Sequence, residues 1–199
     1  YFNNEQLTKE EYHKRFIELN LGSYDAILKL KIKFQEMKQN SIHRFAHIVN
    51  SFNVTGNNID HGKNAFYCFD ASGGIEDSKD IFWAAKGVKD SYSSGPGLGM
   101  ATQAYESFDG GAGGGSFFFC SVVYYSQNIE YSFNCYNCAN LFACLGLRNK
   151  KYCIFNRQYT KEEYEELLPK IKKHMVDMPY IDVIGRVYSY GEFFPIEFS

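Results

Sequence analysis

The sequence lacks any apolar run long enough to cross a membrane. A bilayer-spanning helix needs roughly 18 to 20 consecutive apolar residues, and the 199-residue chain contains no such stretch. Its N-terminus also lacks the basic and then apolar pattern of a signal peptide. We therefore expect a soluble protein without a membrane span.

The sequence also lacks an excess of charge of either sign. It has 21 Lys and Arg against 23 Asp and Glu, and its formal net charge is −2. Proteins that mainly bind nucleic acid normally carry a clear excess of basic residues, because they must neutralise phosphates. The composition therefore argues against nucleic acid as the main partner.

The common short catalytic motifs are missing as well. The glycines of residues 95–115 match neither the phosphate-binding motif G-x-x-x-x-G-K-[ST] nor G-x-G-x-x-G, and the chain has no H-E-x-x-H or G-x-S-x-G. No specific reaction can be assigned from motifs. The glycine-rich segment predicts either a wide loop or a flat surface where backbone must approach something closely.

Cysteines are too sparse for a disulfide-stapled secreted domain, which favours a reduced, cytoplasmic protein. Four of the six lie in the arrangement C-x2-C-x5-C-x8-C, at Cys135, Cys138, Cys144 and Cys153. Four thiolates could hold a tetrahedral zinc ion. Because the second pair is widely spaced within apolar sequence, we favour thiols packed into a core and expect no cofactor, with zinc as the alternative.

Helical patterns occur at both ends of the chain. Residues 1–40 predict two helices, the first starting at a capping box of Thr8 and Glu11. A second capping box, Thr160 with Glu163, predicts a helix within residues 159–178. Residues 179–199 then indicate a short hairpin-like tail with a turn at Gly185.

The middle of the chain, residues 41–158, has the composition of short strands separated by turns. A phrase recurs there as GIEDS at 74–78, GVKDS at 87–91 and NIEYS at 128–132. Units of this kind bury their apolar side only when copies stack. The sequence therefore predicts a mainly β protein, a β-solenoid with flanking α-helices, in which Ser78, Ser91 and Ser132 point into one interior.

Corner and interior positions of the solenoid can be assigned near its end. Asn tolerates the left-handed conformation better than other non-glycine residues. We expect corners, with possible asparagine ladders, at Asn134, Asn137, Asn140 and Asn149. We expect small interior residues at Ser132, Cys135, Cys138, Ala139, Ala143 and Cys144.

Three acidic residues near the glycine-rich region are the candidates for catalysis. Paired carboxylates on a solenoid face could cleave a polysaccharide, and the candidates are Asp60, Glu106 and Asp109. Nothing in the sequence pairs them in space. Turn formation is the favoured role for each, since Asp beside Gly is typical of turns.

One phrase occurs twice, 152 positions apart. NEQLTKEEY at 4–12 and NRQYTKEEY at 156–164 share seven of nine residues. The second copy leads from the last solenoid turn into a capped helix. We expect the first copy to be the exit from an earlier solenoid segment, and the chain, which opens at Tyr1 without Met, to be part of a longer protein.

Long phrases such as RFAHIVNSFNVTGNNI and GLRNKKYCIFNRQYTKEEY resemble a family of uncharacterised bacterial proteins known mainly from metagenomic genomes of candidate phyla. The resemblance covers nearly the whole chain. It implies no activity and no catalytic residue, because none is established for that family.

Three hypotheses of function follow. The favoured one is a non-enzymatic β-solenoid scaffold or binding module whose aromatic and Asn-rich faces bind a protein or a glycan surface. The second is an enzyme that acts on a polysaccharide through carboxylates on a solenoid face. The third is a zinc-dependent binding module.

Overall fold

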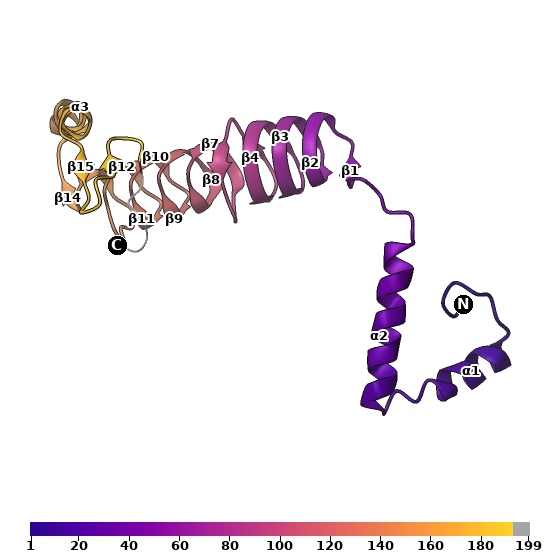
Figure 1. Cartoon of the computed structure of the whole chain (residues 1–199). Helices are drawn as coiled ribbons and strands as arrows, with labels where there is room; N and C mark the ends of the chain where they lie inside the picture. The colour runs from indigo at the N-terminus through magenta and orange to yellow at the C-terminus, as the bar shows by residue number, and fades with distance from the viewer. Residues whose placement is uncertain (193–199) are drawn as a thin grey trace. The chain divides into compact units, whose positions relative to one another are not determined.

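A computed structural model describes residues 1–192 (Figure 1). The chain forms two compact units, and the boundary between them follows Phe45. The first unit, Tyr1–Phe45, holds helices α1 (Lys9–Glu18) and α2 (Tyr24–Gln39), the two expected within residues 1–40. The second unit begins at Ala46 and holds the strands and a third helix. The tail expected over residues 179–199 includes residues 193–199, which lie outside the described part of the chain.

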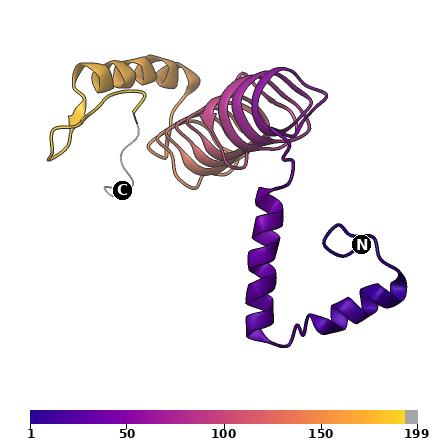
Figure 2. The same ribbon diagram turned by 45° about the vertical axis from the view of Figure 1, so that its right-hand side comes forward.

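The second unit is a β-solenoid of about nine turns, so the predicted fold is confirmed (Figures 1 and 2). Its strands pair in parallel with strands of the turns before and after. Paired residues are 13 apart in the middle of the stack, as Lys63 and Glu76, and 12 apart near its end, as Gln127 and Ala139. The strands are β1 (Ile48–Val49), β2 (Phe52–Asp60), β3 (Gly62–Ala71), β4 (Ile75–Ala84), β5 (Val88–Lys89), β6 (Tyr92–Ser94), β7 (Gly99–Tyr105), β8 (Phe108–Phe118), β9 (Ser121–Tyr124), β10 (Gln127–Glu130), β11 (Phe133–Tyr136), β12 (Ala139–Phe142) and β13 (Lys151–Ile154).

The solenoid is built from a three-residue unit. A residue in the left-handed conformation recurs at every third position, for example Asn134, Asn137 and Asn140 with φ of 55°, 52° and 55°. The residue after each of these is buried, and the next points outward. Four such units complete one of the shorter turns, so the solenoid has four sides and four corners. The longer turns carry one extra residue at a corner, as at Gly73–Gly74.

We name the sides by the inward residue that each carries in one turn. Phe117 lies on side A, Cys120 on side B, Val123 on side C and Ser126 on side D. Residues at the same position in successive turns form a column. The inward column of side A, for example, runs through Ala65, Ser78, Ser91, Ala104, Phe117, Ile129, Leu141 and Cys153.

Asparagine suits the corners because its amide bonds to the equivalent corner of the next turn. Asn128 donates to Asn140 (3.1 Å), and Asn137 donates to Asn149 (2.5 Å). Asn134, like these residues, has a positive φ. The predicted corners and asparagine ladders near the end of the solenoid are therefore confirmed.

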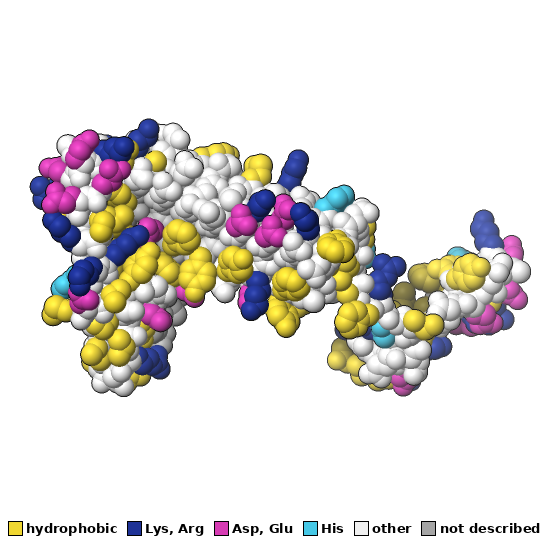
Figure 3. All heavy atoms as spheres, turned by 90° about the horizontal axis from the view of Figure 1, so that it is seen from above, with side chains coloured by type: hydrophobic (Ala, Val, Ile, Leu, Met, Phe, Trp, Pro, Cys, Tyr) yellow, Lys and Arg dark blue, Asp and Glu magenta, His cyan; other side chains and the backbone are white. Residues whose placement is uncertain are grey.

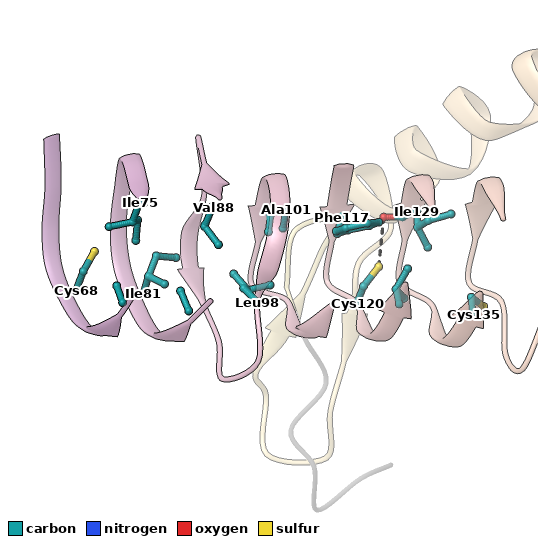
Figure 4. Close-up of a cluster of buried hydrophobic side chains, with 14 of the residues drawn as sticks. Cys68, Ile75, Ile81, Val88, Leu98, Ala101, Phe117, Cys120, Ile129 and Cys135 are labelled. Atoms are coloured by element: carbon teal, nitrogen blue, oxygen red, sulfur yellow. Dashed lines mark hydrogen bonds between the residues drawn. The ribbon is translucent and has the colours of Figure 1, made fainter. Parts of the chain in front are cut away.

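The interior is a continuous stack of mostly small and medium side chains, with the larger ring of Phe117 among them (Figure 4). Ser78, Ser91 and Ser132 are all buried, as predicted. The recurring phrase covers two consecutive three-residue units and is not tied to one side. Ile75 of the first copy lies in the side D column, whereas Ile129 of the third copy lies in the side A column.

Two of the predicted interior positions are wrong. Ala139 points outward from β12, and Ala143 stands at a corner with φ of 52°. Both are half-buried. Inward residues recur every third position, and neither alanine falls on that period, whereas Cys138 and Cys144 do.

The glycine-rich segment is part of the stack and not a loop. Most of its residues belong to β7 and β8, which pair with each other along their length. At Gly111 an added Cβ would lie 2.0 Å from the Gly99 carbonyl oxygen of the preceding turn. Of the two predicted alternatives, close approach of backbone is the one observed.

Inward serines and cysteines satisfy backbone groups inside the solenoid. The Ser91 hydroxyl donates to the Lys89 carbonyl (2.9 Å) and accepts the N–H of Ala104 in the next turn (3.1 Å). Cysteine takes the same place later, where the Cys138 sulfur accepts the N–H of Lys150 (3.5 Å). A buried N–H costs free energy when unpaired, which explains why these two residue types recur inside.

The chain leaves the solenoid through a tight antiparallel turn. Strand β14 (Arg157–Gln158) folds back on β13, pairing Arg157 with Ile154. The pairing covers the side A edge of the last turn, which an open solenoid would otherwise leave unpaired.

Helix α3 (Lys161–Asp177) then packs against the side of the last turns, where Tyr164 lies buried against Phe142 and Ile154. Lys172 of this helix pairs with Glu130 of β10 (2.6 Å). Strands β15 (Tyr180–Ile181) and β16 (Val187–Tyr188) form a small antiparallel pair after it. Among residues 1–192, no helix is both long and apolar enough to span a bilayer.

The serine hydrogen bonds can be tested at Ser91, which is fully buried. We expect Ser91→Ala to lower the free energy of unfolding by about 1–3 kcal/mol, because the Ala104 N–H loses its acceptor. Ser91→Cys is the matched control and should cost less, since cysteine fills equivalent positions elsewhere. Urea unfolding followed by circular dichroism measures both, and equal losses would contradict this account.

Candidate ligand-binding groove

Side B carries a column of half-exposed aromatic rings. Phe69, Phe82, Phe108 and Phe133 are its outward residues, each between 45% and 53% exposed. The column is fixed by strand pairing: Phe69 pairs with Phe82, and Ser121 pairs with both Phe108 and Phe133. Each ring therefore stands on rigid backbone.

The rings alternate with small residues along the second half of the column. Gly95 separates Phe82 from Phe108, and Ser121 separates Phe108 from Phe133. Adjacent strands lie about 4.8 Å apart, so rings two turns apart are spaced by about 10 Å. Gly95 must be glycine, because an added Cβ would lie 2.0 Å from the Phe82 carbonyl oxygen.

A groove of about 770 Å³ lies over these gaps. Phe108 and Phe133 line it with exposed rings, and Phe119 and Cys120, both buried, also line it. Its remaining lining is mostly small and polar. The full lining consists of Ser93, Gly95, Glu106, Ser107, Phe108, Phe119, Cys120, Ser121, Tyr131, Ser132 and Phe133.

Phe119 anchors the corner between sides A and B, next to the groove. Its ring contacts Tyr131 (centroids 4.7 Å apart), Tyr105 (5.6 Å) and Tyr190 (6.1 Å). Tyr190 also donates to Glu130 (2.8 Å), which ties the segment after α3 to this corner. Burial and the Glu130 carboxylate raise the pKa of Tyr190, so its phenol stays neutral and remains a donor.

The groove is nearly neutral. Among the described residues, Glu106 is the one acidic residue in its lining, which includes no Lys or Arg. The negative charge of Glu106 raises the pKa of the neighbouring Tyr105. Burial raises the pKa of Cys120 to about 12, so this thiol of the groove lining stays protonated at neutral pH.

The structure separates the three candidate carboxylates. Glu106 and Asp109 stand at the two corners of side B in one turn, with φ of 44° and 50°. Asp60 lies on side C, between three and four turns away, which is roughly 17 Å along the stack. Asp60 instead pairs with its neighbour His61 (Oδ1 to Nδ1, 2.8 Å).

Glu106 lines the groove, and Asp109 does not. The Asp109 carboxylate accepts a hydrogen bond from the Tyr124 hydroxyl of the next turn. Burial, first, and then Asp109 raise the pKa of Tyr124 to about 12. The positive φ of both acidic residues agrees with the corner role that the sequence favours for them.

The four clustered cysteines lie in four different inward columns. Cys153 is on side A, Cys144 on side B, Cys135 on side C and Cys138 on side D, and all are buried. Their thiols donate to backbone carbonyls two residues earlier, for example Cys144 to Phe142 (3.3 Å). Within the described residues, no group of three or more His, Cys, Asp or Glu side chains is placed to hold a metal ion.

The side B column was missed from the sequence, although a signal is present. Phe69, Phe82, Phe108 and Phe133 follow one another at intervals of one, two and two turns. Reading that spacing requires the turn length at each point of the stack. The shortening of the turns toward the end of the solenoid hides the period.

Figure 3 shows one face of the molecule, on which exposed hydrophobic side chains lie beside a mixed cluster of acidic and basic ones. Along side D, the outward residues Lys63, Glu76 and Lys89 form a charged column in which Glu76 pairs with both lysines (2.8 and 3.5 Å). These charges satisfy one another. The outward column of side B instead carries exposed phenylalanine rings.

Comparisons with protein-family models, curated protein sequences and solved structures returned no match to this chain. Any functional conclusion therefore rests on the geometry of the groove.

The buried thiols predict a loss of stability in alkali. Burial raises the pKa of Cys144 from 9.0 to about 11. Below pH 9 both the folded and unfolded thiol are protonated; between pH 9 and 11 only the unfolded one ionises, so stability falls. We expect Cys144→Ser to reduce this fall by roughly 2 kcal/mol, measured by urea unfolding at pH 8 to 11. An unchanged pH dependence in the variant would contradict the assignment.

Proposed function

We propose that the protein is a non-enzymatic binding module and that side B binds an extended, uncharged glycan along the solenoid axis. The observation that carries this proposal is the column of half-exposed phenylalanines with a groove between its rings. Large exposed aromatic patches on soluble domains commonly mark binding sites. The rigid backbone holds the rings in place before the ligand arrives, which lowers the entropic cost of binding.

The chemistry of the groove suits a sugar polymer. Pyranose rings present flat C–H faces that pack on aromatic rings, and their hydroxyl groups need hydrogen-bonding partners at the edges. The groove offers Phe108 and Phe133 as platforms and Ser93, Ser121 and Glu106 as polar groups. The ring spacing of about 10 Å is close to the length of a disaccharide unit in an extended β-linked chain.

Charge disfavours the main alternatives. A nucleic acid would require basic residues along the groove to neutralise its phosphates, and the part of the lining that the structure describes has none. An acidic glycan would meet the same difficulty beside Glu106. A neutral polymer fits the lining best.

Cleavage of the same glycan is the second candidate, because Glu106 lines the groove. Glycosidases use two carboxyl groups about 5 to 9.5 Å apart. Asp109, three residues further along side B, is not part of the groove lining, and its carboxylate accepts a hydrogen bond from Tyr124. We therefore favour binding without cleavage.

Binding can be measured by co-sedimentation with cellulose and chitin and by affinity electrophoresis in soluble xylan. We expect Phe108→Ala and Phe133→Ala each to weaken binding about fivefold, since an aromatic contact is worth about 1 kcal/mol. Tyr125→Ala is the matched control, because Tyr125 is 65% exposed at a corner away from side B. Binding by none of these polymers, or equal loss in the control, would refute the proposal.

Glu106→Gln separates binding from cleavage. For a binding module, wild type should release no reducing ends from these polymers, and the variant should keep most of the binding, because the glutamine amide still offers a hydrogen-bonding group at the same place in the lining. Reducing ends released by wild type and lost in Glu106→Gln would establish the second candidate in place of the first.

A further inference from the structure

The segment before α1 and the segment before α3 fold in the same way. In the first, Phe2 and Glu5 form an antiparallel bridge around Asn3 and Asn4, whose φ values are 48° and 67°. The type of turn with two positive φ values in succession matches the twist of a two-stranded hairpin.

The solenoid exit repeats this geometry at the other end of the chain. Ile154 and Arg157 pair in antiparallel fashion around Phe155 and Asn156, whose φ values are 48° and 62°. At the exit the turn has a clear role, because it returns the chain along the edge of the last solenoid turn.

Both turns continue into the same capped helix start. Thr8 and Glu11 exchange hydrogen bonds of 2.9 and 3.2 Å, and Thr160 and Glu163 do so with the same two distances. The structural match therefore covers the hairpin and the first turn of the helix. It extends beyond the capping box, which alone is a common way to begin a helix.

The two helices differ in what covers their apolar stripe. In α3, Tyr164 is 6% exposed and packs with Leu168 and Ile171 against the last solenoid turns. The equivalent Tyr12 and Phe16 of α1 are 41% and 44% exposed.

Helix α1 has no buried residue at all. Tyr12 and Phe16 stack on each other (6.2 Å between centroids), and Phe2 contacts Tyr12 edge-on (6.3 Å). The rings of Phe2, Tyr12 and Phe16 thus form an exposed aromatic face, whereas the equivalent face of α3 packs against the solenoid.

We propose that residues 2–19 are a solenoid exit segment and that the aromatic face of Phe2, Tyr12 and Phe16 docks on the terminal turn of a second β-solenoid. That solenoid would be joined to Phe2 in the same polypeptide, as Cys153 is joined to Ile154. We place that solenoid directly before Phe2 in the sequence because of the matching hairpin at the solenoid exit. There the first strand of the hairpin, β13, is itself the edge strand of the solenoid. The expected docking surface is apolar, like the one formed by Phe142 and Ile154.

One difference between the copies supports a pre-formed segment. Arg15 forms an ion pair with Glu5 (2.6 Å) and so ties α1 to its own hairpin. The equivalent pair in the exit is Leu167 and Arg157, of which Leu167 packs toward the solenoid. The hairpin and helix of residues 2–19 are thus held together by an ion pair of their own.

The proposal can be tested by a graft within the full chain, in which residues 154–171 are replaced by residues 2–19. The grafted helix should dock on the last turn, so that amide-exchange protection of residues 139–153 stays within about tenfold of wild type. The matched control carries aspartate in place of the grafted Phe16 and should lose protection by about a hundredfold or more. Equal protection in the graft and its aspartate control would overturn the proposal, as would a graft that fails to fold.

Substitution of Phe16 in the ungrafted chain tests which molecule the aromatic face of α1 binds. Phe16→Asp in the otherwise unchanged chain should leave the urea midpoint of the solenoid unchanged, because the proposed partner turn belongs to another solenoid. Sedimentation velocity of wild type and this variant should give the same species. A wild-type dimer that Phe16→Asp dissociates would instead make a second copy of the chain the occupant and overturn the assignment.

Discussion

The fold depends on one backbone constraint, a residue in the left-handed conformation at every third position. This conformation makes a corner after each three-residue unit. Four units then complete one turn of the solenoid. It also places one inward residue per unit in a shaft too narrow for a second layer of side chains. Small side chains such as Ser91 and Cys138 follow from the narrow shaft, and their oxygen or sulfur atoms accept the backbone donors of the next turn.

The candidate site follows from the same regularity. Stacked turns place outward residues in straight columns, so a phenylalanine recurring at the turn length becomes a row of rings on one side. Gaps in the row arise where close approach of the backbone requires Gly95 or where Ser121 is small. The aromatic row, the groove and its neutral lining are therefore properties of the stack, and no single loop creates them.

The ends of a solenoid need a different solution, because an open turn leaves strand edges and apolar sides uncovered. Here the chain uses a hairpin that pairs with the last strand and a helix that packs beside it through Tyr164. The same local structure recurs at residues 2–19, where the equivalent Tyr12 is exposed. A capped helix after a tight hairpin is easily duplicated, since its geometry is almost entirely local.

The sequence by itself determined the solenoid, its corner asparagines, its buried serines and both capping boxes, because each depends on interactions between residues close in sequence or one turn apart. It misplaced Ala139 and Ala143, since a small side chain does not by itself mark an inward position, and neither alanine falls on the inward position of the three-residue period. Only the tertiary structure decided that Asp60 lies apart from Glu106 and that phenylalanines far apart in sequence share side B. Those relations depend on the number of residues in every intervening turn, which local sequence does not fix.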